Sequence, residues 1–318
     1  MPFEPLRVGI LSAAGCGTAE TQAIQQCAAV CLVAATDGTA IGHGAAAQPE
    51  VPVCSQNELL AREDLEAVLV ASPLHSRAAL VLAALRAGKH VLAEAPLSAS
   101  PEEVEELRLE ARQTGLWLVS RRPLEHQPAL RSLREQVAQG AVGQPAMLHF
   151  SWELPAAANC AGPGVPQGDV LLTVGVQQFD WLLDLLGPAE RIYTRTASRG
   201  EAQAGDYALT SLRFASGAIA EVESSCLAGI RSRLTLEIAG DAGLLSLDSA
   251  QSTAIVVEAG CAERDPFGPA GTLPLELEQW AHRIRTGEPP VAPQHESRSL
   301  CLALAAFKSA ACSKVVTL

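Results

Sequence analysis

Lysine is scarce in this 318-residue chain, which holds only Lys89, Lys308 and Lys314. The 23 basic residues are outnumbered by 35 acidic ones, and the formal net charge is −12. The basic residues form no cluster along the chain. Because duplex nucleic acid and anionic membranes attract proteins through a positive surface, the sequence argues against either as a partner.

Long apolar runs are also missing. No segment approaches the roughly 18 apolar residues that a membrane-spanning helix needs. Met1 to Pro5 lead directly into the apolar run Leu6–Leu11, without the pattern of a signal peptide. The nine cysteines are scattered and include no C-x-x-C pair, which favours reduced thiols and no zinc site. The sequence therefore predicts a cytoplasmic protein that holds no metal ion.

Hydrophobic residues make up 48% of the chain, which is typical of a globular protein and enough for two cores. Short apolar runs alternate with helical stretches in the first third. The predicted strands are Leu6–Leu11, Cys31–Ala35, Leu65–Ala71, His90–Ala93 and Leu116–Ser120, and the predicted helices are Thr18–Cys27, Ala78–Ala87 and Pro101–Thr114. Strands separated by helices of this length predict a parallel sheet covered on both faces.

The pattern changes near residue 121. Helices are predicted at Gln127–Gln139, Val170–Leu186 and Ser297–Ala311, and strands at Ala146–Glu153, Arg191–Ala197, Ala208–Phe214, Ala218–Ser224, Leu234–Ala239, Leu244–Asp248 and Val315–Leu318. Few helices separate these strands, so we expect an open, mostly antiparallel sheet. The sequence thus predicts an α/β protein with two domains, residues 1–121 and residues 122–318.

A strand, a turn and a helix occupy positions 7 to 27. In dinucleotide-binding folds such a helix begins at the pyrophosphate, and glycines let the backbone approach it. Against the pattern G-x-G-x-x-G, this turn keeps only Gly17, with Ser12 and Ala14 at the first two glycine positions. We expect Ser12, Ala14, Gly15, Cys16 and Gly17 to line the cofactor, and a tight turn at Ser12 would favour glycine.

Asp37 lies at the end of the second predicted strand, 20 positions after Gly17. There an acidic residue accepts hydrogen bonds from the ribose hydroxyls of the cofactor. A carboxylate would also repel a 2′-phosphate, so NAD is favoured over NADP. The alternative is that Asp37 merely begins an Asp37-Gly38 turn.

A longer motif follows the third predicted strand. Residues 71–75 read A-S-P-L-H, and residues 83–97 read A-A-L-R-A-G-K-H-V-L-A-E-A-P-L. This resembles the Gfo/Idh/MocA oxidoreductase family (glucose–fructose oxidoreductase and inositol dehydrogenase), in which T-P-N-x-x-H is followed by A-L-x-A-G-K-H-V-x-x-E-K-P. The resemblance implies an N-terminal Rossmann dinucleotide-binding domain and a C-terminal α/β domain with an open sheet, with assembly as a homo-oligomer.

The resemblance also implies a site. It places Ser72, Pro73, His75, Glu94 and Ala95 along the cofactor. On the side of the second domain it places the substrate, a small and sugar-like molecule, near three further residues, Arg122, Asp169 and Gln177.

The family's proton-transferring residues are absent. Its Lys of E-K-P corresponds to Ala95, and the first Asp and the His of its D-x-G-x-H-x-x-D helix correspond to Thr173 and Gln177. The Asn and His of P-N-x-x-H correspond to Leu74 and Arg77. Oxidation of an alcohol must remove the hydroxyl proton, and alanine, threonine and glutamine do not exchange protons near neutral pH.

These replacements lead to a first hypothesis of a catalytically impaired pseudoenzyme that binds a ligand or regulates a partner. A second hypothesis is a divergent NAD-dependent oxidoreductase acting on a sugar, polyol or related alcohol. Its acid/base would have moved, with His75 and His126 as the candidates. A third is an enzyme of another class, such as elimination or hydrolysis.

Overall fold

The structure is a computed structural model in which the chain forms two compact units. The described residues are 3–12, 17–36, 51–155, 170–198, 205–228, 232–250, 271–289 and 296–318. Unit 1 comprises the described residues up to Arg121 together with Thr272–Ser297, and unit 2 comprises the rest. No helix among these residues is long and apolar enough to cross a membrane.

A six-stranded parallel sheet forms the centre of unit 1, with strand order β3-β2-β1-β4-β5-β6. The strands are β1 (Leu6–Ser12), β2 (Val30–Thr36), β3 (Val53–Cys54), β4 (Ala67–Ala71), β5 (His90–Ala93) and β6 (Leu118–Ser120). The chain order reverses at β1, whose neighbours are β2 and β4. Ligands of open α/β sheets bind at the carboxyl ends of strands beside such a switch point.

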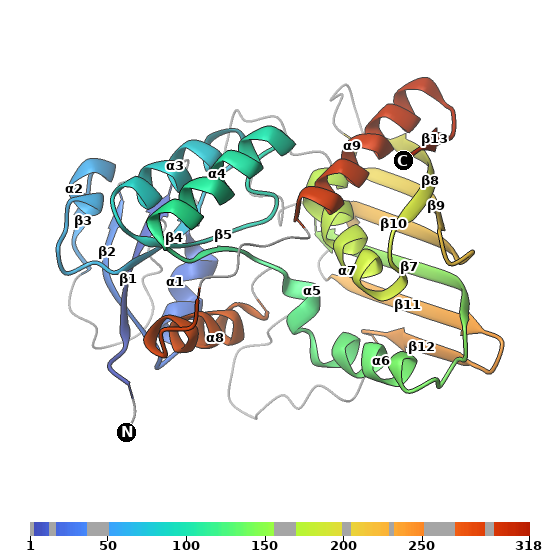
Figure 1. Cartoon of the computed structure of the whole chain (residues 1–318), viewed down its shortest axis with the longest axis horizontal. Helices are drawn as coiled ribbons and strands as arrows, with labels where there is room; N and C mark the ends of the chain where they lie inside the picture. The colour runs from blue at the N-terminus through green and yellow to red at the C-terminus, as the bar shows by residue number, and fades with distance from the viewer. Residues whose placement is uncertain are drawn as a thin grey trace. The chain divides into compact units, whose positions relative to one another are not determined.

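Helices cover both faces of this sheet (Figure 1). They are α1 (Thr18–Gln25), α2 (Gln56–Leu60), α3 (Leu74–Arg86), α4 (Pro101–Thr114) and α8 (Leu273–Arg285). Helix α4 begins as the sequence indicates, because Ser100 Oγ accepts a hydrogen bond from the Glu103 backbone N–H at 3.3 Å and Pro101 occupies the first turn.

Helix α8 corrects the expected division at residue 121, which assigned all of 122–318 to the second domain. It packs in unit 1. Leu273, Leu277 and Trp280 recur on one face of α8 and are buried in one core with Ile24 of α1 and the strands. The return of the chain to unit 1 follows from that apolar stripe.

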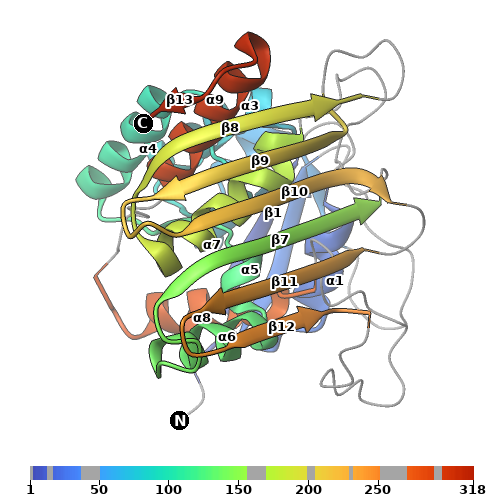
Figure 2. The ribbon, with the colours of Figure 1, turned by 90° about the vertical axis from the view of Figure 1, so that its right-hand side faces the viewer.

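Unit 2 is built on a seven-stranded sheet with order β12-β11-β7-β10-β9-β8-β13 (Figure 2). The strands are β7 (Pro145–Pro155), β8 (Ala189–Ala197), β9 (Tyr207–Phe214), β10 (Ile219–Ala228), β11 (Arg233–Gly240), β12 (Leu244–Asp248) and β13 (Val316–Thr317). Only β7 and β10 pair in parallel, and the other neighbours are antiparallel. The predicted α/β fold class with an open, mostly antiparallel second sheet is confirmed.

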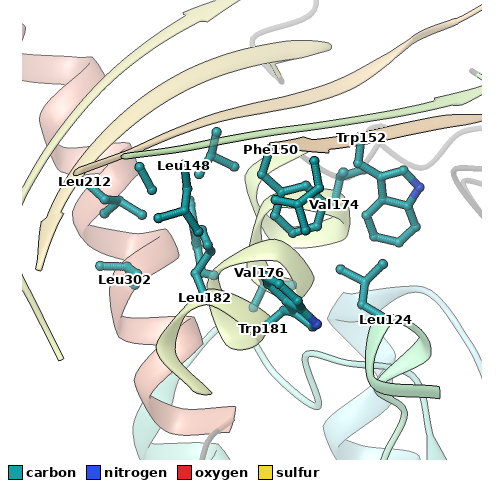
Figure 3. Close-up of a cluster of buried hydrophobic side chains, with 14 of the residues drawn as sticks. Leu124, Leu148, Phe150, Trp152, Val174, Val176, Trp181, Leu182, Leu212 and Leu302 are labelled. Atoms are coloured by element: carbon teal, nitrogen blue, oxygen red, sulfur yellow. The ribbon is translucent and has the colours of Figure 1, made fainter. Parts of the chain in front are cut away.

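One face of this sheet packs on helices. They are α5 (Pro123–His126), α6 (Pro128–Ala138), a π-helical turn η2 (Leu171–Gly175), α7 (Val176–Leu186) and α9 (Glu296–Cys312). Figure 3 shows Leu148, Phe150 and Trp152 of β7 directed toward this layer. The rings of Phe150 and Trp181 meet edge to face with centroids 5.6 Å apart. This core fixes α7 against the sheet.

Candidate functional site

The turn between β1 and α1 begins without the strain expected at Ser12. Ser12 is the last residue of β1, and its backbone N–H donates to Thr36 Oγ1 at 2.8 Å. Gly17 takes the left-handed conformation instead, with φ 112° at the N-cap of α1. The expectation of a glycine-like backbone at Ser12 is therefore wrong, because strand pairing fixes this residue in an extended form.

The N-terminus of α1 is suited to an anion. Gly17 offers no side chain that could cap the first N–H groups of the helix, although the Glu20 carboxylate in the first turn accepts a hydrogen bond from its own backbone N–H. The other predicted residues of this turn, Ala14, Gly15 and Cys16, lie outside the described residues, as does the predicted ribose ligand Asp37.

Two buried hydroxyl groups lie at the carboxyl edge of the sheet in unit 1. Ser72 follows β4 and Ser120 ends β6, with 1% and 5% of their surface exposed. Neither Oγ has a hydrogen-bond partner among the described residues. Buried hydroxyl groups are normally satisfied, so a polar ligand at this edge would account for both. Pro73 beside Ser72 is the N-cap of α3, and His75 lies exposed in its first turn.

Arg77, at the position of a family histidine, is buried and joins the ends of β4 and β5. Its Nη2 donates to the Ser72 carbonyl oxygen at 2.8 Å and to Glu94 Oε2 at 2.9 Å. Its Nη1 donates to the Pro96 carbonyl oxygen at 2.8 Å and to the Glu94 carbonyl oxygen at 3.3 Å. The Arg77 guanidinium thus holds Glu94 and Pro96, the residues on both sides of Ala95. The peptide bond between Ala95 and Pro96 is cis.

Arg121, which follows β6, is surrounded by carboxylates. Its Nη2 lies 3.4 Å from Glu276 Oε1, and its Nη1 lies 3.9 Å from Glu94 Oε1 and 4.0 Å from Glu20 Oε1. Burial by itself lowers the pKa of Arg121, but attraction to Glu276, Glu94 and Glu20 outweighs it and raises the pKa. Burial first, and then the Glu94 carboxylate, raises the pKa of Glu20.

The sequence reasoning missed Glu20 and Glu276. A signal for Glu20 was present, since it lies three residues after Gly17 in the first turn of α1. A carboxylate is unexpected where a helix N-terminus is meant to receive a phosphate. Glu276 gave no such signal, because only the return of α8 to unit 1 brings it near Arg121.

In unit 2, the π-helical turn η2 carries Thr173, and the first turn of α7 carries Gln177, which is buried. The adjacent Gln178 is also buried. Its Nε2 donates to the carbonyl oxygens of Phe150 at 3.1 Å and Glu223 at 3.0 Å. Its Oε1 accepts a hydrogen bond from Ser224 Oγ at 2.6 Å. Gln178 therefore anchors α7 to the sheet.

Arg122 was predicted to hold a substrate, but carboxylates already surround it within unit 2. It contacts Asp180, Asp184 and, at 2.8 Å, Glu125. Burial by itself lowers the pKa of Arg122, yet attraction to Asp180 and Glu125 outweighs it and raises the pKa. Its positive charge is thus matched, which makes it a weak attractor for an anionic ligand. His126 is half-buried on α5, and Asp169 lies outside the described residues.

Within the described residues, no group of three or more His, Cys, Asp or Glu side chains is placed to hold a metal ion. The Gly17 turn, the strand switch at β1 and the unsatisfied hydroxyls of Ser72 and Ser120 fit a dinucleotide at this edge of unit 1.

The fold and this edge define a dinucleotide-binding oxidoreductase architecture with a second, open-sheet domain. Residues 6–121 match the model described as an oxidoreductase family with an NAD-binding Rossmann fold, and residues 130–246 match the GFO/IDH/MocA C-terminal domain. The chain belongs to the GFO/IDH/MocA oxidoreductase family. The predicted family and the NAD-binding domain type are confirmed.

Relatives of known activity share much of the chain. Inositol 2-dehydrogenase 1 of Saccharopolyspora erythraea is 30% identical over 246 residues, which cover 73% of this chain and 70% of that protein. The 1,5-anhydro-D-fructose reductase of Ensifer adhaerens is 29% identical over 272 residues, 81% of each chain.

Solved structures share the fold. The scyllo-inositol dehydrogenase from Lactobacillus casei, with bound NAD(H) and scyllo-inositol, has a TM-score of 0.78 and 18% identity, covering 98% of this chain and 99% of that one. GenD2 from gentamicin A biosynthesis, in complex with NAD, has a TM-score of 0.84 and 20% identity, covering 99% and 97%.

Proposed function

We propose that the protein is an NAD-dependent oxidoreductase that acts on a hydroxyl-bearing carbon of a cyclic polyol, a sugar or a related alcohol. The observation that carries this proposal is the retained cofactor edge of unit 1. There the helix N-terminus at Gly17 has no side-chain cap from its N-cap residue, and the buried Ser72 hydroxyl has no partner among the described residues, so a polar ligand would satisfy both. The names of the relatives, inositol dehydrogenases and a sugar reductase, support the substrate class.

The protein groups have defined tasks in this proposal. Bound NAD would supply the hydride chemistry of the reaction. The chain must bind the dinucleotide, orient the alcohol and remove its hydroxyl proton. Gln177 can donate and accept a hydrogen bond and is proposed to orient the substrate. Ala95 and Thr173 cannot move the proton near neutral pH, so another group must do so.

A second candidate function is a ligand-binding or regulatory protein on the same scaffold. The replacement of three polar positions together, by Ala95, Thr173 and Gln177, favours it. It shares cofactor binding with the first proposal and differs only in the absence of turnover.

Cofactor binding tests what both candidates share. We would titrate the full chain with NADH and, in parallel, with NADPH, by calorimetry. We expect micromolar binding with NADH preferred, and a loss of about 1 kcal/mol in Ser72→Ala from one lost hydrogen bond. Ser211→Ala, a half-buried serine in the sheet of unit 2, is the control and should bind as the wild type. Failure to bind either cofactor at millimolar concentration would overturn the proposal.

Turnover separates the two candidates. We would assay NAD reduction with myo-inositol, scyllo-inositol and a panel of sugars, and NADH oxidation with the corresponding ketones. Turnover of any panel member supports the oxidoreductase. Tight NADH binding without turnover in either direction would favour the regulatory candidate.

We also propose that the protein is a homo-oligomer that assembles through the uncovered face of the seven-stranded sheet. Among the described residues no helix covers the face turned toward the viewer in Figure 2. Four large apolar side chains are exposed on its strands, Met147, Leu209, Ile219 and Leu244. Light scattering of the wild type and of Ile219→Asp would test this, and a monomeric wild type would contradict it. The cytoplasmic location stays a prediction.

A further inference from the structure

Five charged side chains from five elements form a cluster at the carboxyl edge of the unit 1 sheet, called here the edge cluster. Its members are Glu20 of α1, Arg77 of α3, Glu94 after β5, Arg121 after β6 and Glu276 of α8. Every member except Glu94 is buried. Two guanidinium groups thus face three carboxyl groups in surroundings with little water.

The edge cluster is one positive charge short of balance. Isolated charges are costly in a protein interior, so a buried carboxyl group without a close cation takes up a proton instead. Glu94 has Arg77 at 2.9 Å. Glu276 has Arg121 at 3.4 Å and also accepts from Thr272 Oγ1 at 2.8 Å. Glu20 has its nearest guanidinium, that of Arg121, at 4.0 Å, with a weaker attraction to Arg77 and a hydrogen bond from its own backbone N–H. It is the most weakly paired carboxyl group of the cluster and the best candidate to hold the proton.

Glu94 is the member that can pass a proton outward. Its side chain is 26% exposed, and it directly precedes Ala95, the position of the family lysine. In the sheet β5 lies between β4 and β6, so Glu94 is flanked by the residues that bear the unsatisfied hydroxyls, Ser72 and Ser120. Arg77 contacts both Ser72 and Glu94, which confirms their proximity.

We propose that Glu20 and Glu94 share a proton across Arg121 and that Glu94 is the proton acceptor of the reaction proposed above, in place of the absent lysine and histidine. The inference rests on the proposed oxidoreductase function. When the alcohol is oxidised, its O–H bond breaks and the proton goes to the Glu94 carboxylate. The C–H electron pair leaves with the hydrogen as hydride to NAD, and a C=O bond forms. The burial and like charge that raise the pKa of Glu20 favour its role as the proton store.

The shared proton is tested first, without any substrate. Infrared spectra of the full chain, with and without bound NADH, report protonated carboxyl groups by their C=O stretch. We expect a protonated carboxyl band at neutral pH that is lost in Glu20→Gln. Glu276→Gln removes one carboxylate and balances the edge cluster, so in this variant the band should disappear at a lower pH than in the wild type. Glu66→Gln, which alters a carboxylate paired with Arg285, is the control and should keep the band.

The role in the reaction is tested with Glu94→Gln, using NAD and myo-inositol as the probe. We expect kcat to fall on the order of 100-fold or more while NADH affinity stays within about twofold. Glu20→Gln should keep most of kcat near neutral pH but shift the pH–rate profile, because it removes the store and not the acceptor. Glu66→Gln should leave kcat, KM and the profile unchanged.

The outcomes separate the two proposals. A wild type without the protonated carboxyl band, or a Glu20→Gln variant that keeps it, overturns the shared proton. Full activity of Glu94→Gln overturns its role as acceptor while the oxidoreductase function stands. If the band behaves as expected but the wild type turns over no alcohol, the oxidoreductase function fails and the role of Glu94 fails with it.

Discussion

Unit 1 and unit 2 satisfy buried polar groups by different means at the positions that matter for chemistry. Unit 1 uses full charges, with Arg77 and Arg121 bound to carboxylates at the ends of β4, β5 and β6. Unit 2 anchors α7, the helix with the lost histidine position, through the neutral amide of Gln178. Arg122, which is also paired with carboxylates in unit 2, is half-buried.

This difference indicates where proton chemistry can reside. A neutral amide network binds and orients but stores no proton, whereas a cluster with more carboxyl groups than cations, such as the edge cluster, can store one. The sequence resemblance predicts that Thr173 and Gln177 in unit 2 and Ala95 in unit 1 stand at the family's proton-transferring positions. Unit 1 nevertheless retains ionisable groups at the cofactor edge, so any remaining acid/base capacity is concentrated there.

The largest expected effect comes from removing the centre of the edge cluster. Arg121→Met leaves the Glu276 carboxylate buried without its cation, and we expect a loss of about 3–5 kcal/mol in the free energy of unfolding. Urea denaturation followed by circular dichroism measures it. Arg122→Met is the matched change in unit 2, where Arg122 itself and its partner Glu125 are partly exposed although Asp180 is buried, and it should cost less than Arg121→Met. Equal losses would remove the distinction between the two units.

A smaller effect is expected from the amide anchor of unit 2. Gln178→Leu removes three hydrogen bonds, to the carbonyl oxygens of Phe150 and Glu223 and from the Ser224 hydroxyl, which should cost about 2–3 kcal/mol. The neighbouring Gln177→Leu is the comparison. It should cost less stability but raise the substrate KM, whereas Gln178→Leu should leave KM unchanged. Urea denaturation and steady-state kinetics measure the two effects. If Gln177→Leu cost more stability and Gln178→Leu raised KM instead, the assignment of the anchor to Gln178 would be wrong.

The sequence predicted most of the architecture because its apolar periods are strong. Strands such as His90–Ala93 and the helix Pro101–Thr114 were placed within a residue or at their observed bounds. Local signals suffice for such elements, since an apolar run, a cap and a breaking glycine lie next to one another in the chain. Helix α8 was missed because its identity as part of unit 1 depends on contacts with α1.

The candidate site was predictable only in part. Motif spacing located Ser72, Glu94 and Ala95, because the family pattern fixes their order along the chain. It did not reveal that Arg77 fixes both Ser72 and Glu94, or that Arg121 and Glu276 meet across 155 positions of sequence. Charge balance is a property of the folded cluster, and no spacing rule reports it.

The smallest expected effect is a pH dependence of the free energy of unfolding that arises in unit 1 and not in unit 2. His90 of unit 1 accepts a hydrogen bond at Nδ1 from the Trp117 backbone N–H at 3.0 Å, so it must be neutral there. Burial chiefly lowers the pKa of His90 in the folded protein, although Glu66 opposes this. Its folded pKa therefore lies below the unfolded value of about 6.5, and the stabilisation is present above that pH and lost as the pH falls through the folded pKa.

We expect acidification from about pH 7 to about pH 5 to remove about 1 kcal/mol through this one hydrogen bond. Urea denaturation of the wild type and of His90→Gln across that range measures the difference, which should shrink as the pH falls because glutamine does not titrate. His149→Gln, on a strand of unit 2, should keep the wild-type pH dependence. If His149→Gln removed the pH dependence of stability instead, the acid sensitivity would arise in the sheet of unit 2. The assignment of this effect to His90 would then be wrong.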